Sequence, residues 1–168
     1  GTLLKIWLPR PLLTGQSTTV ELSFSVDIPR AAYRFGHFKG VTMLSNWYPI
    51  LAVRDGEGWH LDPYSRLGDP FYSQVSDYEV SILLPTDQVV AATGSLEAEE
   101  AVSPAQKRLR LSARQVRDFA LAASADFQVI AEPVAGGTVY SYYLPGHQAG
   151  GELALRAAAQ ALGYYNRI

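Results

Sequence analysis

Apolar and polar residues alternate through much of this chain, and the dominant period of the alternation is two. The clearest case is Val20–Val26, in which valine, leucine and phenylalanine alternate with glutamate and serine. A period of two predicts a strand with one buried and one solvated face. Alternation and shorter apolar runs together predict the strands Leu4–Leu8, Val20–Val26, Ile50–Val53, Tyr78–Leu84, Val89–Thr93, Arg108–Ala113, Phe119–Ala122, Phe127–Glu132 and Thr138–Leu144.

Turn signals separate these predicted strands. Thr14-Gly15 follows the first one, Asp55–Gly58 has the composition of a tight hairpin turn, and Pro85–Asp87 and Ala135–Gly137 break the later part of the chain. Many short strands with regular breaks and no interleaved long helices are typical of antiparallel proteins. The sequence therefore predicts a mainly β fold, an antiparallel β-sandwich or a curved saddle-like sheet, with one C-terminal α-helix.

That helix is predicted over Gly151–Tyr165, which is rich in alanine and leucine. Its polar residues recur at every fourth position from Glu152 and form one narrow stripe, so the helix is apolar nearly all round. A helix on the outside of a small sandwich is apolar over about a third of its circumference. We therefore expect further polypeptide against this helix. Leu3–Leu8 is likewise too apolar for an unpaired edge, and we expect a partner strand preceding Gly1.

Composition and charge limit the classes of function. The 168 residues fit one domain, and 48% hydrophobic residues are typical of a packed protein rather than a disordered one. A net charge of −2 lacks the basic footprint of a nucleic-acid binder, and we interpret the basic cluster Lys107–Arg117 as a solvated strand face. No apolar run reaches the ~18–20 residues of a membrane span. The absence of cysteine excludes disulfides and thiolate metal sites.

Side chains for metal or nucleophilic chemistry are sparse. The three histidines, His37, His60 and His147, lie far apart along the chain, whereas a zinc hydrolase needs two or three converging imidazoles. His60 and Asp62 share one face of an extended segment, and they are either metal ligands or a surface pair beside Trp59. The serine of Gly94-Ser95 lacks the frame of a nucleophile elbow.

A carbohydrate-binding or adhesion-type module is the alternative that the sequence leaves open. Asp62, Asp69 and Asp77 lie in the aromatic-rich stretch Trp59–Tyr78, and aromatic rings beside acids are common in sugar sites. In the competing interpretation these aromatic residues pack the core and the loops.

Several segments resemble, in order and spacing, the N-terminal domain of the gluzincin zinc aminopeptidases, the alanyl aminopeptidase and leukotriene hydrolase family. The first is Pro11–Ser17 followed by the alternating stretch from Val20, and the second is Asn46-Trp47-Tyr48-Pro49, the form of a bacterial branch. The other similar segments are Gly58–His60, Gly68–Tyr72, Asp77–Pro85, Arg117–Ala120 and Asp126-Phe127. The resemblance covers residues 3–165.

The resemblance implies a non-catalytic part of a larger enzyme. The family's His-Glu-x-x-His zinc helix, its substrate loop and its tyrosine are not in this chain. Residues 1–145 then correspond to the β domain, incomplete at its start, and residues 146–168 to a helix leading into the catalytic domain. Zinc belongs to the parent enzyme and no cofactor to this part. The implied partners are the catalytic domain of the same polypeptide and a peptide substrate.

The same resemblance suggests which residues face the substrate. Residues that precede the corresponding motif in relatives reach the cleft, which here points to Thr42 and Asn46. Packing is the alternative role for each of them. The compartment, bacterial cytoplasm or cell envelope, is left open.

Overall fold

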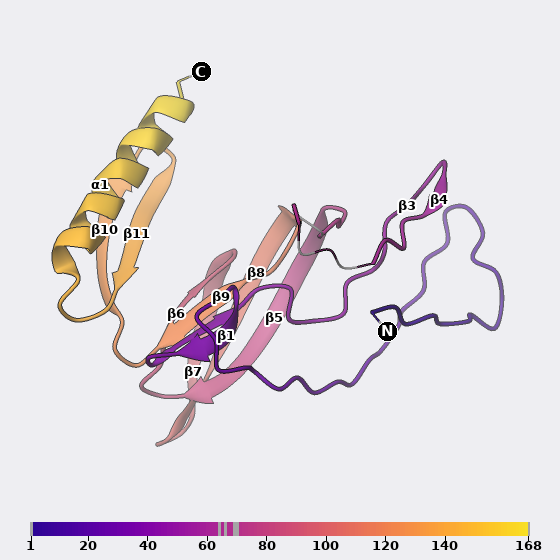
Figure 1. Cartoon of the computed structure of the whole chain (residues 1–168), viewed down its shortest axis with the longest axis horizontal. Helices are drawn as coiled ribbons and strands as arrows, with labels where there is room; N and C mark the ends of the chain where they lie inside the picture. Colours follow the sequence, from indigo (N-terminus) through magenta and orange to yellow (C-terminus); the bar gives the residue numbers. More distant parts are fainter. Residues whose placement is uncertain (1, 64, 66, 69–70, 168) are drawn as a thin grey trace.

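The computed structural model describes residues 2–63, 65, 67–68 and 71–167 and confirms the predicted fold class. Strands account for 40% of the chain and helix for 11%. Every strand pair among the described residues is antiparallel, and the helix lies at the C-terminal end (Figure 1). Asp69 and Tyr64, which belong to the aromatic stretch considered for sugar binding, lie outside the described residues.

The longest strands form a three-stranded sheet in the order β5-β8-β7. Their bounds are β5 Ser76–Pro85, β7 Ser95–Ser103 and β8 Gln106–Val116. The alternating pattern explains the register, because Val80 pairs with Leu111 and Ile82 with Leu109, so that apolar side chains share one face. Arg108 and Arg110 lie on the opposite face, as the sequence predicts, whereas Lys107 pairs with Leu84 on the apolar face and Arg117 lies beyond the end of β8.

A second sheet has four strands in the order β1-β2-β9-β6. Their bounds are β1 Phe35–Phe38, β2 Val41–Leu44, β6 Val89–Ala92 and β9 Leu121–Ser124. Lys39 and Gly40 join β1 to β2 with φ angles of 48° and 78°. Positive φ at both central residues is the geometry of a tight hairpin turn that follows the strand twist.

The hydrophobic core gathers side chains from both of these sheets. Phe119 is completely buried, and it precedes β9 in a connecting segment where the sequence had predicted a strand. The buried members of the core cluster are Leu84, Leu109, Leu111, Ala113, Phe119 and Leu121. Half-buried residues such as Leu44 and Tyr78 pack around them. The core therefore joins the two sheets in a sandwich-like arrangement.

The C-terminal part forms a hairpin with a helix packed against it (Figure 1). The hairpin strands are β10 Gln128–Val134 and β11 Gly137–Tyr143, and the helix is α1 Gln148–Tyr165. Gly151 is buried against the Tyr143 ring, and its carbonyl accepts a 2.9 Å hydrogen bond from the Ser141 hydroxyl. The helix begins three residues before its predicted start and packs on the hairpin that immediately precedes it in the chain.

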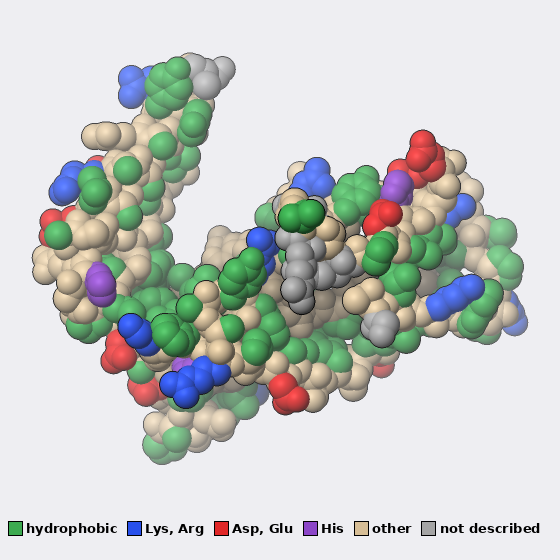
Figure 2. Space-filling model, viewed as in Figure 1, with side chains coloured by type: hydrophobic (Ala, Val, Ile, Leu, Met, Phe, Trp, Pro, Cys, Tyr) green, Lys and Arg blue, Asp and Glu red, His purple; other side chains and the backbone are tan. Residues whose placement is uncertain are grey.

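The N-terminal stretch corrects two predictions. Neither Leu4–Leu8 nor Val20–Val26 is a strand. Their apolar side chains are exposed, Trp7 at 80% and Phe24 at 49%. Hydrophobic side chains are visible in Figure 2 at the end of the molecule where Figure 1 places this loop. Alternation shows that a segment suits a sheet, but a strand also needs a neighbour for its backbone groups, and no described strand is paired with Leu4–Leu8 or Val20–Val26.

The short hairpin predicted around Asp55–Gly58 is present, with β3 Arg54–Asp55 paired to β4 Gly58–Trp59. The preceding run Ile50–Val53 was predicted to be a strand, and this prediction is wrong. Val53 of this run is buried whereas Leu51 is 80% exposed, so the run is a connecting segment that packs through only part of its apolar residues.

Candidate functional site

Thr42 is in the middle of β2, where it lies opposite His37 across the hairpin. Its hydroxyl oxygen is 2.9 Å from His37 Nδ1. On its other side Thr42 pairs with Ala123 of β9. Thr42 therefore lies on the same face of the sheet as its cross-strand partners, and a hydrogen bond to an imidazole holds its side chain in place.

Asn46 follows β2 in a left-handed backbone conformation with φ of 53°, which asparagine tolerates better than most residues. The preceding Ser45 is fixed by a 3.1 Å hydrogen bond from its N–H to the carbonyl of Arg34. The Ser45 hydroxyl also donates to Asn46 Oδ1 at 3.4 Å. None of the hydrogen bonds among the described residues joins Asn46 to Thr42. The two predicted cleft residues are therefore positioned by different partners.

The Tyr48 cluster, made of Trp47, Tyr48, Tyr78, Asp118 and Phe119, joins two distant parts of the chain. The Trp47 indole donates to the Phe119 carbonyl at 3.0 Å. The Tyr48 hydroxyl is 2.9 Å from Asp118 Oδ1 and 2.9 Å from the Tyr78 hydroxyl, and it accepts the Phe119 N–H at 3.2 Å. Adjacent side chains thus satisfy both backbone groups of Phe119, the most buried residue of the core.

The electrostatics of this cluster keep Tyr48 neutral. The Tyr48 hydroxyl can donate its one proton to the Asp118 carboxylate or to the Tyr78 hydroxyl, and its oxygen accepts the Phe119 N–H. The pKa of Tyr48 is raised well above its ordinary value, first by burial and then by its hydrogen bond with Tyr78. The phenolate is disfavoured, and the cluster acts as a structural hydrogen-bonded unit.

A slot lies beside this cluster, between two segments of the chain. It has a volume of about 430 Å³ and is lined by residues 48–54, residues 73–76, Trp59 and Tyr78. Tyr48 and Tyr78 therefore belong both to the cluster and to the slot. Most of the lining is aliphatic or aromatic, and its polar members are Arg54, Ser73, Gln74 and Ser76. We refer to this space as the slot.

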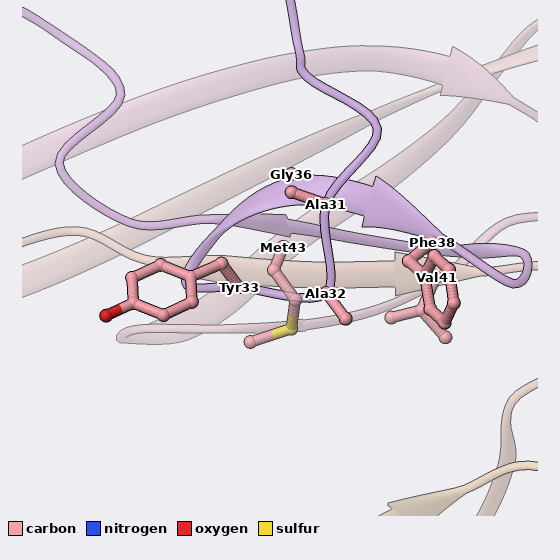
Figure 3. A pocket seen from close by; sticks show the side chains of 7 residues that line it. All are labelled: Ala31, Ala32, Tyr33, Gly36, Phe38, Val41 and Met43. Atoms are coloured by element: carbon pink, nitrogen blue, oxygen red, sulfur yellow. The ribbon is translucent and has the colours of Figure 1, made fainter.

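A second pocket lies against the outer side of the β1–β2 hairpin (Figure 3). Its volume is about 310 Å³, and its lining side chains are those of Ala31, Ala32, Tyr33, Phe38, Val41 and Met43 together with Gly36. Val41 and Met43 alternate with Thr42, so they lie on the opposite face of the sheet from it. This pocket has no charged lining residue, and Thr42 and Asn46 are not part of it.

His60 bonds to Asp55 rather than to Asp62, its partner in the sequence-based metal hypothesis. Its Nε2 is 2.6 Å from Asp55 Oδ2, and its ring meets that of Tyr72 edge-on at 5.4 Å. The pKa of Asp55 is lowered, first by the N–H of Glu57 and then by the His60 bond. The described residues contain no group of three or more His, Cys, Asp or Glu side chains arranged to hold a metal.

Of the acids considered for sugar binding, Asp77 is engaged in ion pairing on the surface. It accepts the backbone N–H of Gln115 at 2.8 Å and contacts Arg114 at 3.2 Å. Both interactions lower the pKa of Asp77, the backbone hydrogen bond most. Trp59 and Tyr72 are 53% and 57% exposed, so these two rings of the aromatic stretch are not core residues.

Comparison with protein-family models, with curated proteins and with solved structures found no significant match to this chain. Among the described residues, no helix is long and apolar enough to cross a bilayer. The structural class, a mainly β protein with antiparallel sheets and a C-terminal helix, therefore comes from the coordinates alone.

Proposed function

We propose that this chain is a non-catalytic N-terminal β domain of a zinc-dependent aminopeptidase, which covers one side of the active-site cleft and helps to position the peptide N-terminus. The observation that carries the proposal is the joining of two segments of the family resemblance. Trp47 and Tyr48 belong to the Asn-Trp-Tyr-Pro stretch, and they hydrogen-bond Asp118 and Phe119 of the Arg-Asp-Phe-Ala stretch. The two similar segments therefore meet in one hydrogen-bonded unit, as expected if both belong to the same family fold.

The unpartnered apolar surface also supports the proposal. Only Gly151, Leu155 and Ala159 of α1 are buried, whereas Leu153 is 63% and Tyr164 61% exposed. A helix that is apolar on its outer side suits a position between the hairpin and a further domain. In the parent enzyme, that domain would be the catalytic one.

The contribution of this domain would be shape rather than chemistry. In the parent enzyme a zinc-polarised water attacks the scissile carbonyl with a glutamate as general base, and all of these groups belong to the catalytic domain. Thr42 and Asn46 are the proposed cleft-side residues of this chain. The left-handed backbone of Asn46 supports that role, since such conformations persist where the surroundings fix them and cluster at ligand sites.

An activity assay tests the proposal directly. The isolated chain should not hydrolyse aminoacyl-anilide substrates, with zinc or with a chelator, and a longer product of the same gene should contain the His-Glu-x-x-His helix and be active. In that longer protein, Asn46→Ala should raise KM more than it lowers kcat, with Asn166→Ala as the matched control. Chelator-sensitive hydrolysis by this chain alone would refute the proposal, as would a gene that encodes no zinc helix downstream.

A carbohydrate-binding or adhesion-type module is the second candidate, and the exposed rings of Trp59 and Tyr72 favour it. Aromatic rings that project beside polar groups provide platforms for sugar faces. Glycan-array binding stronger than millimolar, lost in Trp59→Ala and retained in Trp7→Ala, would favour this function over the first. The two candidates are thus separated by one binding experiment on the existing chain.

A further inference from the structure

The slot is lined mainly by two stretches of the chain, residues 49–53 and 73–76, which form its two walls and do not pair with each other as strands. Ser76 is the first residue of β5. At about 430 Å³ the slot falls within the range of roughly 300–1,000 Å³ in which protein ligand sites occur.

The walls carry backbone groups of the kind that bind peptides. The N–H and C=O groups of Leu51, Ala52 and Val75 have no hydrogen-bond partner among the described residues. A strand added beside such a segment gains main-chain hydrogen bonds, and pockets for its alternate side chains provide selectivity. The aliphatic lining, with Ile50 and Val53 on one wall, suits an aliphatic side chain of that strand.

The charge at the slot indicates which chemical group of a bound peptide should lie next to its aliphatic side chain. Arg54 lines the slot and makes no ion pair with any described residue. The neighbouring acid Asp55 alternates to the other side of β3 and is bound to His60. A guanidinium that lines a mostly apolar slot and has no ion-pair partner among the described residues is complementary to a carboxylate, with which it forms paired hydrogen bonds.

We propose that the slot binds an extended peptide, with an aliphatic side chain between the two walls and a carboxylate against Arg54. The carboxylate comes either from the peptide's C-terminus or from an acidic side chain. This site is separate from the proposed cleft residues Thr42 and Asn46, neither of which lines the slot. The inference therefore does not depend on the aminopeptidase proposal.

Isothermal titration calorimetry of the whole chain tests the site with three peptides that share the sequence Val-Leu-Val. The probes are acetyl-Val-Leu-Val with a free C-terminus, the same peptide as its amide, and acetyl-Val-Leu-Val-Glu as its amide. We expect saturable binding below a millimolar for at least one carboxylate-bearing probe and at least tenfold weaker binding for the neutral amide. Equal binding of all three, or none by any, would overturn the proposal.

Two variants locate the binding. Arg54→Glu should weaken binding of the carboxylate-bearing probe at least tenfold. Arg156→Glu, with the same change of charge on α1, should leave the affinity unchanged. Val75→Trp should block the slot without loss of fold, because Val75 is 51% exposed. Binding that survives both Arg54→Glu and Val75→Trp would show that the peptide sits elsewhere. Binding of neutral oligosaccharides but of no peptide would assign the slot to sugars and contradict the proposal.

Discussion

The indole Nε1 of Trp47 donates a 3.0 Å hydrogen bond to the carbonyl oxygen of Phe119, a residue 72 positions further along the chain. Phe119 has no exposed surface, so its backbone groups are shielded from water and need partners within the protein. Trp47 and the adjacent Tyr48 supply them. The link therefore fixes the segment before β9 at the point where the two sheets meet.

Replacement of Tyr48 by phenylalanine tests the importance of this link. Tyr48→Phe keeps the ring but removes the hydroxyl that serves Asp118, Tyr78 and the Phe119 N–H, and it should lower the free energy of unfolding by about 1–3 kcal/mol. Urea unfolding followed by tryptophan fluorescence measures the change. The matched control, Tyr140→Phe at a 57% exposed ring, should stay within about 0.5 kcal/mol of the wild type. Equal effects of the two substitutions would contradict the structural role of the cluster.

Gly94 should tolerate no side chain. Its φ is 84°, and a Cβ built there would clash with the carbonyl oxygen of Ser112 and with the side chain of Ala113. Gly94→Ala should therefore destabilise the protein by more than about 1 kcal/mol, since neither the backbone nor its neighbour can yield cheaply.

Gly150 is the matched control for this substitution. A Cβ there would meet nothing within 4 Å, and the residue lies in α1, so Gly150→Ala should stabilise by about 0.5 kcal/mol or more. Thermal unfolding of both variants checks the pair. If Gly94→Ala left the thermal stability unchanged, the β6–β7 connection would have to take another conformation.

Asp77 should retain its charge to lower pH than an ordinary aspartate. Its pKa lies below the ordinary 3.8 because it accepts the Gln115 N–H and contacts Arg114. Between the unfolded-state pKa and the lower folded-state pKa, the unfolded chain binds more protons than the native one. The stabilisation is therefore fully present above the ordinary pKa and is lost as pH falls through the folded value.

Carboxyl NMR titration measures this shift. Arg114→Ala should raise the pKa of Asp77 only part of the way toward its ordinary value, because the larger contribution, the Gln115 hydrogen bond, remains. Arg156→Ala, remote on α1, should leave the titration of Asp77 unchanged. A complete return to the ordinary pKa in Arg114→Ala would assign the shift to charge rather than to the backbone hydrogen bond.

The two faces of α1 should respond differently to truncation. Leu155 is buried against the β10–β11 hairpin, so Leu155→Ala should destabilise the helix by about 2 kcal/mol or more, whereas Leu153→Ala should change little in this chain. Hydrogen exchange of the helix amides measures both. In a longer product of the gene, the aminopeptidase proposal predicts that Leu153→Ala becomes destabilising. If Leu153→Ala had no effect in the longer protein, no further domain would cover the outer face of α1, which would contradict the proposal.

Periodicity predicted the long strands β5 and β8 but not the short, adjacent strands β1 and β2. β5 and β8 follow the alternation of Tyr78–Leu84 and Arg108–Ala113, and the Asp55–Gly58 turn forms its hairpin. Val20–Val26 has an equally regular pattern and is not a strand. Side-chain alternation carries information on which face is apolar, but none on whether a partner strand is present to bond the backbone.

The site was less predictable than the fold. The sequence indicated Thr42 and Asn46 only through a family resemblance, and it paired His60 with Asp62 although Asp55 is the residue that His60 contacts. A hairpin turn separates His60 from Asp55, and spacing along a single strand does not capture contacts across a turn. The Tyr48–Asp118 contact spans 70 residues. Such a contact arises from the packing of two sheets and leaves no local pattern in the sequence.

The strand order of the four-stranded sheet has a consequence for how the protein is made. β9 lies between β2 and β6 although it is the last of the four to be synthesised. On the ribosome, the β1–β2 hairpin and β6 emerge before the strand that joins β2 to β6, and the sheet cannot close until β9, which ends at Ser124, is available. Because closure depends on such distant pairing, formation of this sheet is expected to be a late and slow step, during which the nascent chain needs protection from misassociation.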